Sequence, residues 1–248
     1  MPSPRTKKKT SAQVKSRSKM QGSSRVAPSA NRAVKGSHAL FIPFVILIFI
    51  LWTVYRVFFD FPIWFDESIG KAVFFGFPVV LYISLTGFAG ISQAVSLKKF
   101  KQGVLQGLAF GGIFGFAAAL ASIASANKTV IPVPFFESGA FWFEFGLALL
   151  TGVWESIFFF GFIMTLIQYL WSHWSLGKQV LLVAFIFAIF HVPAILVQYT
   201  GAGSLAGYIF LVTAFGIGQA FLYARNQNIY TLMVVHAIWG MTLLVHTL

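Results

Sequence analysis

Three ionisable side chains stand inside long apolar stretches in the second half of the sequence: Glu155, His191 and His236. A charged group within membrane hydrocarbon costs about 2.5–3.5 kcal/mol on insertion scales, so such a group is a candidate for function and needs a polar partner. One carboxylate and two imidazoles can activate water for hydrolysis, either around a metal ion or by general-base action of the carboxylate alone. Because the sequence has no cysteine, a metal would have to be held by histidine and carboxylate.

Each of these residues also has a simpler interpretation. A single histidine in a membrane helix often does no more than hydrogen-bond a neighbouring carbonyl group. Glu144 precedes Glu155 on nearly the same face of a helix, but it lies near the start of that helix, where it could reach water. The functional interpretation therefore depends on the three residues lying together.

The chain that must position them is strongly apolar. Of its 248 residues, 58% are hydrophobic and 10% are charged, and thirty are phenylalanine. This composition indicates an all-α fold, a polytopic transmembrane helical bundle of about seven spans, with residues 38–248 as one transmembrane domain. The expected spans are residues 39–59, 72–95, 103–125, 140–171, 179–199, 205–224 and 229–247.

Three segments have features of their own. Residues 103–125 are rich in glycine and alanine, which predicts a buried helix packed closely against its neighbours. Residues 140–171 form an unbroken run too long for a perpendicular span, so we expect this helix to tilt, to project from the membrane, or to divide near Gly152. Residues 60–71 hold three of the six acidic residues and are interpreted as an exposed loop.

Positive charge is concentrated at the N-terminus. Residues 1–37 contain ten lysines and arginines and no acidic residue, and the whole chain has a net charge of +12. A segment of this composition cannot bury enough apolar surface to fold, so we expect a disordered tail that stays in the cytoplasm and contacts anionic lipid headgroups. No nucleic acid is expected as a partner. With seven crossings, the basic loops at 96–101, 172–178 and 225–228 would share the cytoplasmic side.

The residues around the three ionisable side chains resemble the motifs of a known family. Glu-Ser-Ile-Phe-Phe-Phe-Gly begins at Glu155, Phe-Ala-Ile-Phe-His ends at His191, and His-Ala-Ile-Trp-Gly begins at His236. In order and spacing they are similar to the Glu-Glu-x-x-x-Arg, Phe-x-x-x-His and His-x-x-x-Asn or Asp motifs of the CAAX protease and bacteriocin-processing enzymes (the CPBP, or ABI, family), which are intramembrane proteases. The resemblance covers about residues 140–248.

The resemblance implies a role for each residue. Glu155 would be the general base that activates water, and His191 and His236 would hold that water or stabilise the oxyanion. Phe187, from the second motif, would support them. No cofactor is certain from the resemblance, and a zinc ion held by the same three ionisable residues is the alternative. The substrate would be a membrane-embedded or lipidated peptide or protein.

This sequence departs from the family pattern at three positions. Ser156 replaces the second Glu, Phe160 replaces the Arg, and Gly240 replaces the Asn or Asp. Without the Arg, no cation on the same helix can balance the charge of Glu155. Without a side chain at position 240, an oxyanion donor is missing unless a backbone group, a water molecule or Gln219 replaces it.

From these features we predict a multi-pass integral membrane endopeptidase that hydrolyses peptide bonds with a Glu-activated water. A catalytically inactive scaffold or immunity-type protein of the same fold is the alternative, and replacement of Glu155 would separate the two. A proton-coupled transporter could also use an intramembrane Glu and His pair, but the sequence lacks the internal repeats and broken helices typical of such proteins.

Overall fold

The computed structural model of the protein describes residues 38–126, 139–198 and 202–245. The tail predicted for residues 1–37 lies outside these ranges, and so do Glu137 and His246. From Leu40 onward the chain forms one compact unit. The described residues form helices joined by short turns and contain no strand, so the predicted all-α fold class is confirmed.

Each apolar segment predicted as a span contains a helix. The first segments are α2 (Phe41–Phe58) and the continuous run Ile63–Thr86, made of α3 (Ile63–Phe65), η1 (Asp66–Gly70), η2 (Ala72–Gly76) and α4 (Phe77–Thr86). Two short 3-10 turns, η3 (Gly90–Gln93) and η4 (Leu97–Lys99), lead into α5 (Phe100–Ala126). The remaining elements are α6 (Gly139–Glu155), η6 (Ser156–Met164), α7 (Thr165–Leu170), α8 (Leu176–Gln198), α9 (Ala202–Asn226) and α10 (Ile229–Val245).

Five helical segments of the described chain are long and apolar enough to cross a membrane. They are Phe41–Phe58, Ile63–Thr86, Phe141–Leu170, Leu176–Val197 and Leu205–Asn226. A shorter apolar helix covers Ile229–Met241. The total of about seven spans therefore stays a prediction for α5 and α10.

The predicted exposed loop at 60–71 is wrong from Ile63 onward. That residue begins a helix, and Asp66 and Lys71 are buried within it. Charged side chains are tolerated there because they pair with groups on neighbouring helices, which offsets the cost of removing them from water. The composition of one segment cannot show such contacts.

The second span also ends earlier than predicted. It stops at Thr86, where Gly87 adopts a φ of 68° and its N–H donates to the carbonyl of Ile83. Glycine takes this left-handed conformation without a steric penalty, so it commonly ends helices in this way. The stretch up to residue 95 that was predicted to be helical therefore forms short turns.

Helix α5 packs closely on one face. A Cβ at Gly107 would lie 2.5 Å from the Cβ of Val234, and a Cβ at Gly111 would lie 2.6 Å from the Cδ1 of Ile238, so the small size of glycine lets α5 approach α10 closely. The predicted close packing is confirmed. The predicted burial is wrong, because α5 also exposes the large apolar side chains Leu105, Leu108, Ile113 and Phe116.

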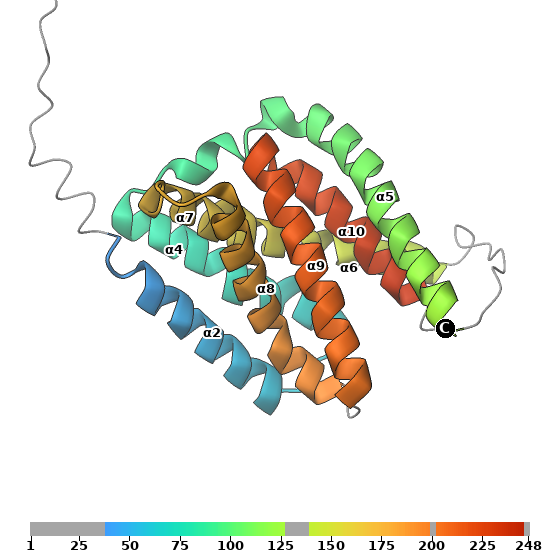
Figure 1. Ribbon diagram of the computed structural model, residues 1–248. Coiled ribbons are helices and arrows are strands. Elements are labelled where there is room, and N and C mark those ends of the chain that lie inside the picture. Colours follow the sequence, from blue (N-terminus) through green and yellow to red (C-terminus); the bar gives the residue numbers. More distant parts are fainter. Residues whose placement is uncertain (1–37, 127–138, 199–201, 246–248) are drawn as a thin grey trace, which may run out of the picture. The chain divides into compact units, whose positions relative to one another are not determined.

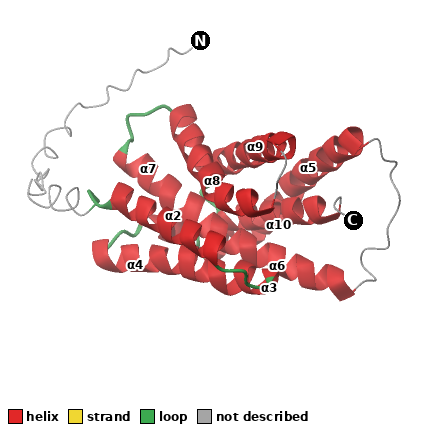
Figure 2. Ribbon diagram, turned by 90° about the horizontal axis from the view of Figure 1, so that it is seen from below, coloured by secondary structure: helices red, strands yellow, loops and turns green. Residues whose placement is uncertain are grey.

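Contacts between helices fix the arrangement around the centre of the bundle. Helix α10 packs against both α5 and α6, and α8 packs against α9 and α2. Helices α2 and α5 lie at opposite edges of the bundle in Figure 1, and Figure 2 shows the same helices from below. The ionisable residues singled out from the sequence therefore lie on the inner helices.

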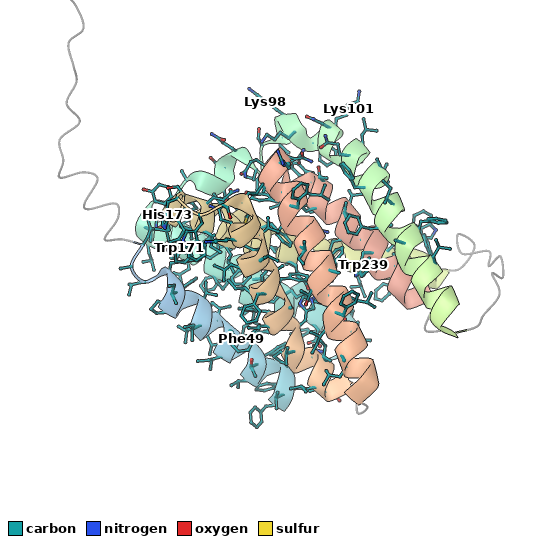
Figure 3. All side chains as sticks on the ribbon, viewed as in Figure 1. Phe49, Lys98, Lys101, Trp171, His173 and Trp239 are labelled. Atoms are coloured by element: carbon teal, nitrogen blue, oxygen red, sulfur yellow. The ribbon has the colours of Figure 1, made fainter. Side chains whose placement is uncertain are left out.

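Two of the three basic loops meet at one end of the bundle. The Lys99 Nζ donates to the carbonyl of Gln227 at 2.7 Å, and the Gln227 amide donates to Gln168 at 3.0 Å. Lys98 and Lys101 point outward at this end (Figure 3). Two of the loops predicted to share a side of the membrane thus lie together.

Candidate active site

Glu155 occupies the point at which the long helical run changes its hydrogen-bonding pattern. It is the last residue of α6, and η6 continues the same helix with π-helical, i→i+5 bonding. The run neither breaks nor divides at Gly152. Single π-helical stretches inside α-helices frequently occur at functional sites. The Glu155 side chain is only 2% exposed, so its charge depends on the groups that surround it.

Both predicted histidines reach the same oxygen of this carboxylate. The Nε2 atoms of His191 on α8 and His236 on α10 each lie 3.5 Å from Glu155 Oε2. The structure therefore brings the three predicted residues together. Their catalytic role stays a prediction, because proximity alone does not establish chemistry.

A backbone hydrogen bond determines which nitrogen of His191 carries a proton. The Nδ1 of His191 lies 2.8 Å from the carbonyl oxygen of Phe187, one helical turn earlier. A carbonyl oxygen can only accept, so Nδ1 is the donor and the neutral ring keeps its lone pair on Nε2, the atom that faces Glu155. The Phe187 ring packs against the imidazole with a centroid distance of 4.3 Å. Phe187 therefore supports His191 through both its backbone and its ring.

Lys71, which the sequence interpretation had placed in a loop, is the cation next to Glu155. Its Nζ lies 2.7 Å from Glu155 Oε1 and 2.5 Å from Glu67 Oε2. The Thr151 hydroxyl also donates to Glu67 Oε2. The available signal was the i,i+4 spacing of Glu67 and Lys71, which favours an ion pair on a helix.

A second group of charges lies beside the first. Asp66 accepts hydrogen bonds from the Tyr55 hydroxyl and from the guanidinium of Arg56. Both partners come from α2, so this group fixes the start of the second helical run against the end of α2. Arg56 is thereby committed to Asp66 and does not contact Glu155.

These residues line a cavity of about 600 Å³. Its charged lining residues are Arg56, Asp66, Glu67, Lys71, Glu144 and Glu155. Its apolar lining includes Phe75, Phe143, Leu147, Phe187, Phe190, Val212, Phe215 and Trp239. Trp239 is labelled on α10 in Figure 3. The cavity thus joins a polar centre to an apolar wall.

The motif positions that depart from the family pattern lie in different places. Gly240 lines the cavity, and a Cβ there would meet only Ala148 at 3.6 Å. Ser156 and Phe160 are fully buried and do not belong to the cavity lining. Gln219 is also absent from that lining, and its amide donates to the carbonyl of Leu232. Gln219 is therefore not placed as the replacement oxyanion donor.

The three residues do not fit a metal site. Within the described ranges, no group of three or more His, Asp or Glu side chains is arranged to hold a metal ion. One oxygen of Glu155 is bound to the Lys71 ammonium, and a cation so close repels a divalent cation at the same carboxylate. We therefore derive no catalytic step through zinc.

Comparison with known proteins supplies an independent observation. Residues 137–242 match the family model described as type II CAAX prenyl endopeptidase Rce1-like. The resemblance to the CPBP family is therefore confirmed over this segment. The CPBP match contains Glu155, His191 and His236, and together with the apolar helices it indicates an integral membrane protein.

The CPBP match starts at the beginning of α6, so Glu67 and Lys71 lie outside it. No curated protein and no solved structure matches the chain.

Proposed function

We propose that the protein is an intramembrane endopeptidase of the CPBP type, in which Glu155 activates water to hydrolyse a peptide bond. The observation that carries this proposal is the position of Glu155 Oε2, which lies 3.5 Å from each of two imidazole nitrogens. In the described part of the chain this buried oxygen has no hydrogen-bond partner. Buried polar atoms are normally satisfied by protein or by ordered water, so the oxygen is suited to bind a water molecule.

The nucleophilic water would sit between Glu155 Oε2 and the two Nε2 atoms. It would donate one proton toward Glu155 and the other toward the lone pair of His191. As its oxygen attacks the peptide carbonyl carbon, Glu155 takes the first proton and the carbonyl oxygen becomes an oxyanion. An N–H of His236 would stabilise that oxyanion. Glu155 then gives its proton to the leaving nitrogen as the C–N bond breaks.

The cavity supports a substrate with an apolar part. Its wall carries aromatic and aliphatic side chains beside the charged centre, which suits a membrane-embedded or lipidated peptide. The matched family is named for CAAX prenyl endopeptidases, whose substrates carry a prenyl group. A prenylated peptide is therefore the substrate to test first.

Orientation in the membrane is part of the same proposal. We place the N-terminus in the cytoplasm, with its basic tail against anionic lipid headgroups. The ten basic residues of the tail and the meeting of two basic loops at one end of the bundle support this orientation.

The decisive experiment compares wild type with Glu155→Gln, purified in detergent, on a prenylated CAAX peptide. The amide keeps the size of the side chain but cannot take up a proton, so cleavage should fall by about 10²–10⁴, the range typical of a lost general base. Melting temperature reports whether the variant still folds.

Two outcomes would contradict the proposal. Equal, measurable cleavage by wild type and Glu155→Gln would remove Glu155 from the mechanism. An inactive wild type that gains activity with Phe160→Arg and Gly240→Asn would instead identify the natural protein as an inactive scaffold of the same fold.

A further inference from the structure

Lys71 joins two carboxylates that belong to different helical segments. Its ammonium lies between Glu67, one turn earlier on its own helix, and Glu155 on α6. We propose that Lys71 supplies the positive charge that the family motif places at position 160, and that it orients Glu155 for catalysis. Lys71 is then a positioning residue, since it acts on the reaction through Glu155. Only its effect on cleavage rests on the proposed peptidase function.

Burial makes this charge necessary. The side chains of Lys71 and Glu155 are 10% and 2% exposed, so neither charge is balanced by water. A buried charge is retained in proteins only when it is paired and hydrogen-bonded. The short contact between them satisfies both requirements.

No other cation among the described residues is placed to take this role. Phe160 stands where the motif has Arg, and it is fully buried, with its ring against Phe187. Arg56 lines the same cavity but is paired with Asp66. Lys71 is thus the cation that contacts Glu155.

The geometry also explains how the carboxylate is aimed. Lys71 holds Oε1, which leaves Oε2 directed at His191 and His236. Lys71 is itself held by Glu67, and Glu67 accepts a hydrogen bond from Thr151, one turn before Glu155. Thr151, Glu67, Lys71 and Glu155 therefore form one connected network between two helices. Loss of the ammonium would leave Glu67 held by Thr151 and would free Glu155 Oε1 to turn.

Because the chain has no natural cysteine, the charge at position 71 can be removed and restored chemically. Lys71→Cys should reduce cleavage by about 10²-fold or more, the loss typical when a catalytic group is misplaced by about 1 Å. Alkylation with 2-bromoethylamine, carried to completion as judged by intact mass, rebuilds a side chain of lysine length with a terminal amine and should restore at least a tenth of wild-type activity. Methyl methanethiosulfonate adds a neutral group at the same sulfur and should restore nothing.

Lys178→Cys is the matched control, because Lys178 is exposed in the first turn of α8. It should cleave like wild type before and after both reagents. Full activity of unmodified Lys71→Cys, or equal recovery with the charged and the neutral reagent, would overturn the proposal.

A second measurement does not need peptidase activity. Infrared spectroscopy of Lys71→Met at neutral pH should show a protonated carboxyl band that is absent from wild type and from the double variant Lys71→Met/Glu155→Gln. If wild type cleaves no peptide but this band appears as expected, the peptidase function fails and the role of Lys71 stands. If the spectra of wild type and Lys71→Met are identical in this region, Lys71 does not balance the charge of Glu155.

Discussion

Gly152 on α6 lies directly against α10, next to the backbone of Met233 and the Cβ of His236. A Cβ at position 152 would be 2.8 Å from the carbonyl oxygen of Met233 and 3.2 Å from the Cβ of His236. The first distance is too short for any side chain, so the close approach of the two helices requires glycine. Because Glu155 lies one turn farther along α6, this contact sets how near His236 comes to the carboxylate.

The first prediction concerns this helix contact. Gly152→Ala should force α6 and α10 apart, destabilise the protein by about 1–3 kcal/mol as overpacking does, and reduce cleavage by moving His236. Gly146→Ala on the same helix is the control, because a Cβ there meets nothing within 4 Å. It should be neutral or slightly stabilising, since alanine favours helix by about 1 kcal/mol over glycine. Thermal unfolding in detergent and peptide cleavage measure both effects, and equal behaviour of the two variants would contradict the interpretation.

The second prediction concerns the oxyanion donor. Gly240→Asn places an amide where the family has Asn or Asp, and the nearest atom to the new Cβ is that of Ala148 at an ordinary 3.6 Å. The variant should fold as wild type does, and it should cleave faster or, if a backbone group already serves as donor, at the same rate. Gly240→Ala fills the same space without a donor and should not accelerate cleavage. A tenfold or greater loss in Gly240→Asn would show that the position must stay open.

The third prediction separates packing from chemistry at the second motif. Phe187→Leu removes the ring beside His191 but keeps the backbone carbonyl that accepts a hydrogen bond from Nδ1. We expect kcat to fall about tenfold, which corresponds to the loss of an aromatic contact of about 1.4 kcal/mol, and KM to change little. His191→Ala should lose about 10²–10⁴. Phe162→Leu is the control for lost packing, because Phe162 is equally buried but packs against Phe41, Phe44 and Tyr82. It should lower the melting temperature without lowering kcat of the folded protein.

The all-α fold could be predicted from the sequence because apolar runs long enough to cross a membrane are typical of transmembrane helices. The helix bounds were predicted least well between Asp60 and Val95. There the charged residues indicated a loop, whereas the structure extends a helix from Ile63 to Thr86 and ends it at Gly87. A single sequence displays the charges of one helix but not the partners that other helices bring to it.

The same physical reason limited the prediction of the site. Glu155, His191 and His236 were recognisable because ionisable groups are rare within apolar helices. Lys71 was overlooked because it stands among polar residues, and only tertiary packing brings it to Glu155. Of the outcomes expected for the long helix, division near Gly152 does not occur, and the helix instead changes to π-helical bonding after Glu155, which no periodicity in the sequence indicates.

The fourth prediction concerns membrane orientation. Asp60 and Lys98 are exposed at loops that the predicted topology assigns to opposite sides, whereas Asp66 and Asn228 are buried and unsuited to labelling. In intact cells or sealed vesicles, Lys98→Cys should react with a membrane-impermeant thiol reagent only from the cytoplasmic side, and Asp60→Cys only from the other side. All labelling of the protein then comes from the introduced cysteine, because the chain has no other cysteine. Labelling of both variants from one side would overturn the topology.

The position of Lys71 before residue 137 has a consequence for how relatives of this protein should be compared. A comparison restricted to residues 137–242 finds Phe160 in place of the motif arginine and finds no other cation beside Glu155. Such a comparison would class the chain as an inactive member of the family. The proposed replacement, Lys71, lies in the Ile63–Thr86 run, outside the matched segment. If Lys71 takes the role of that arginine, active relatives that lack the arginine should carry a lysine at the corresponding place in the Ile63–Thr86 run, and inactive relatives should lack it. Under that proposal the residues that set the charge of Glu155 begin in the Ile63–Thr86 run rather than at residue 137.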